Sequence, residues 1–425
     1  MAYALMASCR SPSSERRSGV PYLEDAAYRR ATLQAALVDP GNAYSRLRLD
    51  HYCTGRVNDW DRLPEWNPAT ETIAAAELDL PSGASSTVMS PAAAPLLLPD
   101  VVSGPDDPAL VALGKLAFSR YPVQLAPSLT VALASRAAAA RYGLWIDPRR
   151  GVGGLVRARM GDRSVAIAFT CASCHAARVP GGVDDGNNNP DLDLGAAILT
   201  TDGRALDPER ARDIGAWGPG RLDVTTTAGT EPARIPDLRP VRFLTHLHQD
   251  ATLVVRDPMI LAIRIETLIV TSHGQVLRPP RVVALAIARY LATLADSLPP
   301  LGPARIASAR GADLFASECE SCHVPPALTG PPVDLAAVGT DPTLGRSAER
   351  GTGTYRVPSL RGVGRRTPLL HDGTIPSLDV MFDPRRLDAG FGARLHGAGA
   401  IPGHRFGLNL AEPDRRALVA FLRAL

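Results

Sequence analysis

The chain has 425 residues, of which 45% are hydrophobic and 21% charged, and its formal net charge is +3. This size and composition are typical of a globular protein of two or three domains. The small, evenly spread charge and the lack of a basic tract with interleaved aromatic residues argue against nucleic-acid binding. No stretch approaches the roughly twenty apolar residues that span a bilayer, so membrane association would require an anchor.

The N-terminus offers one candidate anchor. Residues 5–9, Leu-Met-Ala-Ser-Cys, resemble the end of a bacterial lipoprotein signal, although the charged and long apolar regions of such a signal are missing. Cys9 is therefore either acylated, in a chain whose true start lies upstream, or an incidental cysteine in a tail. Cys53 also stands apart from the other cysteines, and we expect it to be buried as a small apolar residue.

Residues 1–100 are rich in proline, alanine and serine, as in 81–86 and 91–95, and predict an irregular extension. The first domain is expected to follow over residues 101–300. It opens with apolar residues at the spacing of one helix face, namely Leu110, Leu113, Leu116, Ala117 and Phe118.

Only two apolar runs, 165–170 and 268–271, predict strands, so the fold is expected to be mainly α. A second strong helix is predicted over 282–298. The proline-rich residues 299–303 end this helix and mark a domain boundary.

The second domain is expected to cover residues 301–425. It closes with a helix over 413–425 whose apolar residues form one stripe. Its first helix carries Ile306, Ala309, Ala312 and Phe315 and leads into the second motif.

The chain contains two copies of the pattern Cys-x-x-Cys-His. The composition predicts roughly 0.002 such patterns by chance, so the pair is significant. In this motif the two thiols add to the vinyl groups of a haem and the histidine binds its iron. We therefore predict two covalently attached c-type haems, held by Cys171, Cys174 and His175 and by Cys319, Cys322 and His323.

A zinc site or a redox Cys-x-x-Cys pair is disfavoured because a histidine directly follows the second cysteine in both copies. The motifs lie about 150 residues apart, which fits one haem per domain. The order of helix, motif, loops and C-terminal helix predicts two cytochrome c-like domains in tandem, with an irregular N-terminal extension. Because covalent attachment needs a maturation apparatus on the oxidising side of the membrane, we expect a periplasmic protein.

The residue at the sixth position of each iron decides between electron transfer and chemistry with oxygen or peroxide. Residues 176–245 contain neither histidine nor methionine, so the first haem has no local sixth ligand. Four more histidines lie further from the first motif. A structural role is favoured for His246 and His248, and His51 and His273 are not assigned a role.

Near the second haem the candidate ligands are His371, Met381, His396 and His404. Met381 lies at helical spacing with Leu378 and Phe382, which favours a core position. His396 lies in a glycine-rich loop and is expected to be solvated. His404 has no apolar periodicity around it, and its flanking glycines allow the backbone to approach a porphyrin. We therefore predict His404 as the sixth ligand.

Several segments carry a family resemblance. Residues 355–361 and 371–374 resemble the signature of di-haem cytochrome c peroxidases and their methylamine-utilisation relatives. Further segments are similar to the di-haem branch that includes bacterial rubber oxygenases, and with them the resemblance covers nearly the whole chain. These segments are residues 60–68, 142–145, 170–177, 186–189 and 403–407.

The two branches of this family imply different chemistry. The peroxidases have a removable histidine ligand shortly after the first motif, which this chain lacks, and a methionine ligand at the second haem. The rubber oxygenases have an open first haem that binds dioxygen and a second haem with two histidines, which matches His175 alone and His323 with His404. Because the long insertions of the rubber oxygenases are absent, the resemblance does not extend to polyisoprene as the substrate.

Other polar residues admit two interpretations each. His371 and Asp372 either bond a haem propionate or belong to an Asp-Gly turn. Trp217 either lies between the haems or is a buried structural residue, which is favoured. Arginines close to the signature either neutralise propionates or form a solvated face; these are Arg361, Arg365 and Arg366.

The sequence therefore predicts a periplasmic di-haem oxidoreductase. Its first haem would react with dioxygen or peroxide, and its second would relay electrons. The alternatives are a pure electron carrier with both irons six-coordinate and a haem-bearing sensor. The expected partners are a small redox protein or an organic or oxygen substrate, with membrane contact only through a lipid anchor at Cys9.

Overall fold

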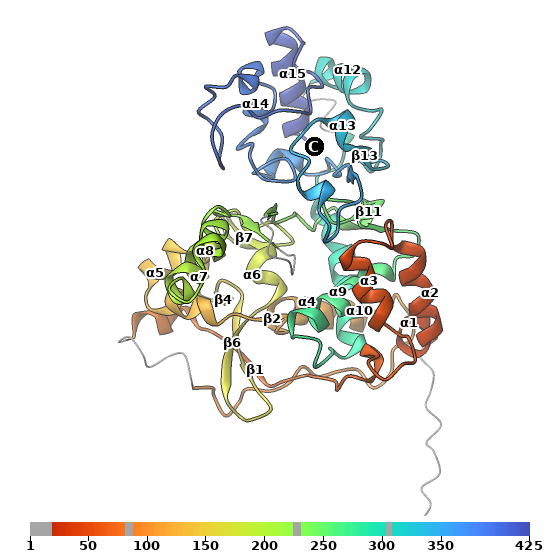
Figure 1. Cartoon of the computed structure of the whole chain (residues 1–425), viewed down its shortest axis with the longest axis vertical. Coiled ribbons are helices and arrows are strands. Elements are labelled where there is room, and N and C mark those ends of the chain that lie inside the picture. Colours follow the sequence, from red (N-terminus) through yellow and green to blue (C-terminus); the bar gives the residue numbers. More distant parts are fainter. Residues whose placement is uncertain (1–18, 81–87, 224–230, 303–307) are drawn as a thin grey trace, which may run out of the picture.

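The computed structural model describes residues 19–80, 88–223, 231–302 and 308–425. Helices account for 40% and strands for 12% of the structure, which confirms a mainly α fold. Figure 1 shows two lobes, which we call the N-terminal lobe, residues 19–302, and the C-terminal lobe, residues 308–425. Each lobe has a separate main hydrophobic core.

The start of the chain differs from the predicted irregular extension. Three helices lie within the first hundred residues, α1 (Pro21–Glu24), α2 (Ala26–Ala36) and α3 (Ala43–His51). They join the core of the N-terminal lobe beside α9 (Ile260–Ser272). The hydroxyl of Tyr22 donates to buried Glu266 on α9 at 2.9 Å. Tertiary contacts of this kind stabilise short polar helices that periodicity alone does not reveal.

Two helices cross closely in the N-terminal lobe, α4 (Pro108–Arg120) and α10 (Arg281–Thr293). A Cβ added at Gly114 would lie 2.0 Å from the Ala286 carbonyl oxygen, so the crossing requires glycine. One turn further, the rings of Phe118 and Tyr290 meet edge to face at 5.6 Å. Both helices confirm the predictions, except that Leu116 of α4 is exposed and that α10 continues only as a 3₁₀ turn, η5 (Leu294–Ser297).

The C-terminal lobe repeats this crossing with α12 (Ala309–Glu318) and α15 (Glu412–Arg423), both predicted from the sequence. A Cβ at Gly311 would lie 2.1 Å from the Ala417 carbonyl oxygen. The rings of Phe315 and Phe421 are 5.3 Å apart. In each lobe, the first helix thus carries a glycine and, four residues later, an aromatic residue. These two residues contact an alanine and an aromatic residue on the second helix.

A four-stranded antiparallel sheet precedes the first motif. Its order is β1 (Thr70–Thr72), β5 (Leu155–Arg159), β6 (Val165–Phe169) and β2 (Gln124–Leu125). Strand β6 confirms the prediction for residues 165–170. The strand predicted at 268–271 is wrong because these residues lie inside α9. Short apolar runs fit a buried helix as well as a strand.

The remaining elements are short. In the N-terminal lobe they are η1 (Trp60–Arg62), η2 (Ala75–Asp79), η3 (Pro127–Leu133), α5 (Arg136–Arg141), β3 (Ile146–Asp147), β4 (Gly151–Val152), α6 (Cys171–His175), β7 (Ala176–Val179), β8 (Gly182–Asp185), α7 (Leu194–Asp202), α8 (Pro208–Gly215), β9 (Arg221–Leu222), β10 (Ala233–Arg234), η4 (Val241–Phe243), β11 (His246–Leu247) and β12 (Leu253–Val254). In the C-terminal lobe they are β13 (Val333–Asp334), α13 (Leu335–Val338), η6 (Leu344–Arg346), β14 (Thr354–Tyr355), η7 (Val363–Arg365), α14 (Leu378–Met381) and η8 (Pro384–Leu387).

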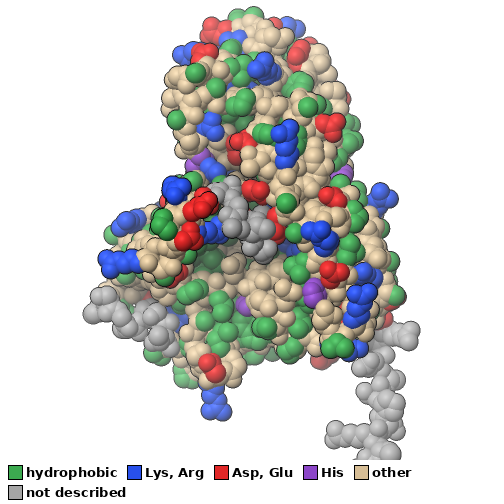
Figure 2. Space-filling view, in the orientation of Figure 1, with side chains coloured by type: hydrophobic (Ala, Val, Ile, Leu, Met, Phe, Trp, Pro, Cys, Tyr) green, Lys and Arg blue, Asp and Glu red, His purple; other side chains and the backbone are tan. Residues whose placement is uncertain are grey.

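Cys53 is 8% exposed and burial raises the pKa of its thiol to about 12, which confirms the predicted buried position. Cys9, Ile306 and the segment 81–86 lie outside the described residues. Within the described ranges, no helix has the length and apolar character to cross a membrane. Figure 2 shows acidic and basic side chains dispersed over both lobes on the visible face.

The helix crossings give a stability prediction. Gly311→Ala is expected to lower the free energy of unfolding by roughly 2 kcal/mol, because an overpacking cost of about 3 kcal/mol exceeds the gain of about 1 kcal/mol in helix propensity. Urea unfolding followed by circular dichroism measures the change. Gly390→Ala is the control, since a Cβ there meets nothing within 4 Å. Equal stabilities of the two variants would contradict the close packing.

Candidate functional site

The first motif forms α6, directly after β6. The Thr170 hydroxyl donates to the Gly154 carbonyl at 2.7 Å, and the Ser173 hydroxyl donates to the same oxygen at 3.0 Å. Gly154 has a φ of +63°, and a Cβ there would lie 2.7 Å from the Ser173 nitrogen. This glycine therefore lets the end of the sheet hold the motif at close range.

The imidazole of His175 is held by the backbone. Its Nδ1 lies 3.0 Å from the Pro236 carbonyl oxygen, so it donates a proton there and leaves the Nε2 lone pair free. Burial lowers the pKa of His175 to about 4, so the ring is neutral at pH 7. Metal-binding histidines typically make this second hydrogen bond, which fixes the ring and its tautomer.

The second motif follows α12 and repeats the arrangement. Nδ1 of His323 lies 3.1 Å from the Leu328 carbonyl oxygen, and burial lowers the pKa of His323 to about 4. Burial also raises the pKa of the Cys171, Cys174 and Cys319 thiols to about 12. In the parts of the chain that the structure describes, no group of three or more His, Cys, Asp or Glu is arranged to hold a metal ion.

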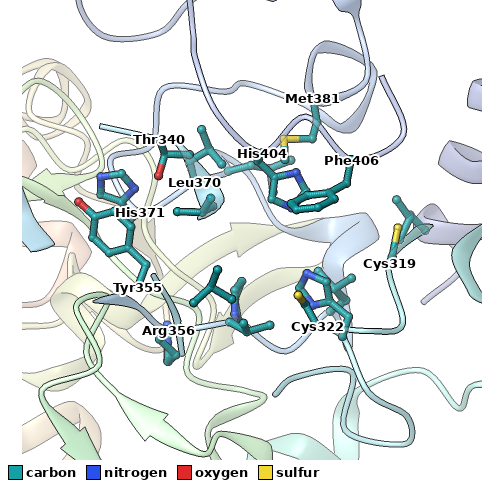
Figure 3. Close-up of a pocket in the computed structure, with 18 of the residues that line it drawn as sticks. Cys319, Cys322, Thr340, Tyr355, Arg356, Leu370, His371, Met381, His404 and Phe406 are labelled. Carbon is teal, nitrogen blue, oxygen red and sulfur yellow. The ribbon is translucent and has the colours of Figure 1, made fainter. Parts of the chain in front are cut away.

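A cavity of about 170 Å³ opens beside the second motif. Figure 3 shows Cys319 and Cys322 at one end and Tyr355, Arg356 and His371 at the other. Apolar side chains form most of its wall, namely Val333, Val338, Val357, Pro358, Leu360, Leu369, Leu370, Leu378, Phe382, Phe406 and Leu422.

His404 and Met381 lie on the side of this cavity opposite Cys322 (Figure 3). Burial, and then the nearby His323, lower the pKa of His404 to about 4. The Nδ1 of His404 is buried and has no hydrogen-bond partner among the described residues. The structure thus brings His323 and His404 to one cavity.

One of the glycines around His404 lies at a close contact between loops. A Cβ at Gly403 would lie 2.2 Å from the Thr340 nitrogen, so this glycine lets two loops of the C-terminal lobe touch. His404 itself has a φ of +40°, and its backbone N–H donates to the Val338 carbonyl at 2.6 Å. The loop therefore places the imidazole over the cavity through contacts between protein backbones.

Met381 is 7% exposed and belongs to the core of the C-terminal lobe, as predicted, yet it also lines the cavity. His396, predicted to be solvated, is partly exposed, and its imidazole also packs against Gly218 of the N-terminal lobe, where an added Cβ would lie 2.9 Å from its Nδ1. Burial lowers the pKa of His396 to about 4. Contacts between distant segments gave no signal in the local sequence.

His371 lines the cavity and stacks on Tyr355 with ring centroids 4.1 Å apart. Asp372 accepts from the Thr374 backbone at 3.2 Å and its hydroxyl at 2.9 Å. The two residues therefore take different roles, since the histidine faces the cavity and the aspartate forms the turn.

The distant histidines have other partners. The guanidinium of Arg264 donates to Nε2 of His248. His273 bonds the Pro122 carbonyl at 3.2 Å, and His246 bonds the Thr245 hydroxyl at 3.1 Å. His51 bonds the Asn58 carbonyl at 3.1 Å and stacks on Trp60.

The arginines close to the family signature differ in their contacts. Arg361 donates to the Pro299 carbonyl at 2.9 Å, whereas Arg366 is buried and lines the cavity. Trp217 is 4% exposed and packs near Gly195 of α7, in accordance with a structural role.

The residues present fit a c-type haem at the second motif. Two thiols lie at one end of an apolar cavity, imidazoles come from two sides, and Arg234, Arg356 and Arg366 supply positive charge. Haem sites combine these features, because the porphyrin is apolar while the iron and propionates need polar partners.

Comparison with known proteins adds little. No family model matches the chain, and no curated protein matches its sequence. One solved structure, described as a MauG-like protein associated with microbial copper homeostasis, is 18% identical over 51% of this chain and 79% of that chain, with a TM-score of 0.34. At this TM-score the likeness does not establish a shared fold.

Proposed function

We propose that this protein is a c-type cytochrome with two covalently bound haems that acts as an oxidoreductase. One observation supports this above all: the histidine of each Cys-x-x-Cys-His motif bonds a backbone carbonyl through Nδ1, at 3.0 Å and 3.1 Å. Both Nε2 atoms are thereby free to bind iron. Each lobe would hold one haem, so that the N-terminal lobe and the C-terminal lobe would be the two cytochrome units.

The second haem would be held by Cys319, Cys322 and His323, with His404 as its sixth ligand. His404 has a buried, neutral imidazole on the cavity. A six-coordinate iron with two imidazoles exchanges electrons with little rearrangement. We assign electron relay to this site.

The first haem would be held by Cys171, Cys174 and His175, with an open sixth position. Nε2 of His248 accepts from Arg264 and Nε2 of His273 bonds the Pro122 carbonyl, so we assign neither as a sixth ligand. His246 is bonded only through Nδ1, and carbon monoxide binding tests whether it closes the iron. A haem iron with an open position reacts with dioxygen or peroxide. The hydrogen bond to the Pro236 carbonyl holds His175 in place, and burial keeps its ring neutral.

Covalent haem attachment places the protein in the periplasm in this proposal, and a lipid anchor at Cys9 is the one expected membrane contact. A small redox protein would exchange electrons with the second haem, and an organic or oxygen substrate would react at the first.

Carbon monoxide is expected to shift the absorption spectrum of about one haem in two in the fully reduced protein. Carbon monoxide binds only to iron whose sixth position is open or weakly occupied. If neither haem responds, both irons are six-coordinate and the protein is an electron carrier. If both respond, His404 is not a strong ligand of the second haem.

A further inference from the structure

Two segments of the chain repeat the pattern Arg-x-Pro-x-Leu-Arg. One is residues 234–239, Arg-Ile-Pro-Asp-Leu-Arg, and the other is residues 356–361, Arg-Val-Pro-Ser-Leu-Arg. The carbonyl of Pro236 accepts the His175 hydrogen bond, and the backbone of Pro358 lies near His323, where it opposes the lowering of the imidazole pKa by burial. Each segment therefore lies beside the motif histidine of its own lobe.

The first arginine of each segment forms hydrogen bonds to the other lobe. The Arg234 backbone N–H donates to the His371 carbonyl at 2.8 Å, and the Arg356 N–H donates to the Gln249 carbonyl at 2.9 Å. The Arg234 Nε also donates to the Leu370 carbonyl at 3.0 Å. These reciprocal bonds bring a guanidinium of the N-terminal lobe into the cavity of the C-terminal lobe.

The two guanidinium groups are buried with positive charge in excess. Burial and mutual repulsion with neighbouring arginines lower the pKa of Arg234 to about 9 and that of Arg356 to about 10. Nη1 of Arg234 and Nε of Arg356 lack a hydrogen-bond partner in the described ranges. The two nearby buried acids have other partners: Asp237 pairs with Arg239 at 2.7 Å and Arg366 at 3.4 Å, and Asp250 pairs with Arg350 at 2.8 Å. Buried charge of this kind is costly unless an anion compensates it.

The position of the arginines in the cavity indicates which anion would compensate their charge. Haem carries its vinyl groups on one edge and its two propionates on the opposite edge. Cys319 and Cys322, which would bond the vinyl edge, lie at one end of the cavity, and Arg356 lies at the other (Figure 3). The Thr340 hydroxyl at that end is buried and has no partner among the described residues.

We infer that Arg234 and Arg356 bind the propionate carboxylates of the second haem, so that the N-terminal lobe completes the cofactor site of the C-terminal lobe. This inference rests on the proposed haem at the second motif. Arg234 is then a positioning residue that couples the two lobes, because its backbone bonds His371 while its side chain bonds the cofactor. Fork-shaped guanidinium donors suit carboxylates.

Arg234→Gln is the test, in the full-length haem-loaded protein. Loss of a buried positive charge beside the propionates favours the ferric state, so the ferric-to-ferrous ratio of the second haem at a fixed potential should rise about tenfold. For a one-electron couple this equals a midpoint lower by about 59 mV. Spectroelectrochemical titration measures it. Arg234→Lys, which keeps the charge, should restore most of the shift.

Arg361→Gln is the matched control, because this arginine ends the second copy of the repeat but bonds the Pro299 carbonyl. An unchanged potential in Arg234→Gln, or an equal shift in Arg361→Gln, would overturn the inference. If Arg234→Gln does not fold, the resonance Raman bending mode of the propionates is compared between wild type and Arg234→Lys. The frequency of this mode should differ between the two proteins, and an identical frequency would overturn the inference. Absence of haem from the wild type would instead overturn the proposed function.

Discussion

The double variant Cys319→Ala, Cys322→Ala is expected to carry one covalently bound haem per chain where the wild type carries two. The cavity beside this motif is lined by apolar residues, and without thioether bonds the cofactor would be lost on denaturation. The variant Cys171→Ala, Cys174→Ala should lose the other haem. Pyridine haemochrome spectra and the mass of the denatured chain measure the number retained.

Cys53→Ala is the matched control for these variants. Cys53 is a buried cysteine outside both motifs, and its sulfur accepts from Arg29 Nε at 3.4 Å. This variant should keep both haems. The assignment is wrong if Cys53→Ala loses a haem, or if either motif variant retains two.

His404→Ala is expected to convert the second haem completely from low spin to high spin. The imidazole lies across the cavity from Cys322 and is held there by the backbone bond to Val338, and no apolar methyl group can replace its lone pair. Electron paramagnetic resonance of the oxidised protein shows the change. Carbon monoxide should then bind both haems of the reduced protein.

Met381→Ala separates the two candidates for the sixth position. Met381 also lines the cavity, but it belongs to the core of the lobe, so its replacement should reduce stability by about 2–5 kcal/mol and leave the second haem low spin. The opposite result, high spin in Met381→Ala and low spin in His404→Ala, would give the ligand role to the methionine.

The long helices could be predicted from the sequence because their apolar residues keep a helical period and prolines or glycines end them. Helices α1–α3 could not, since their stability depends on distant partners such as Glu266, which accepts from Tyr22 and Tyr52. Residues 268–271 were assigned to a strand because a short apolar run does not distinguish the two structures.

The motif residues were evident because haem chemistry fixes their spacing, whereas the groups that orient them are backbone carbonyls of Pro236 and Leu328, which leave no signature. The contact of His396 with Gly218 depends on packing between the lobes. Arg234 did have a signal, the repeated Arg-x-Pro-x-Leu-Arg segment. This repeat is hard to recognise because its two copies lie at different distances along the sequence from their Cys-x-x-Cys-His motifs.

The most direct test of the central claim is the mass of the denatured wild-type chain, after expression with a c-type haem maturation apparatus. The two motifs predict a chain that keeps two haems through acid-acetone extraction, each bound by two thioether bonds. A chain that keeps one haem, or none, would contradict the account of a di-haem cytochrome.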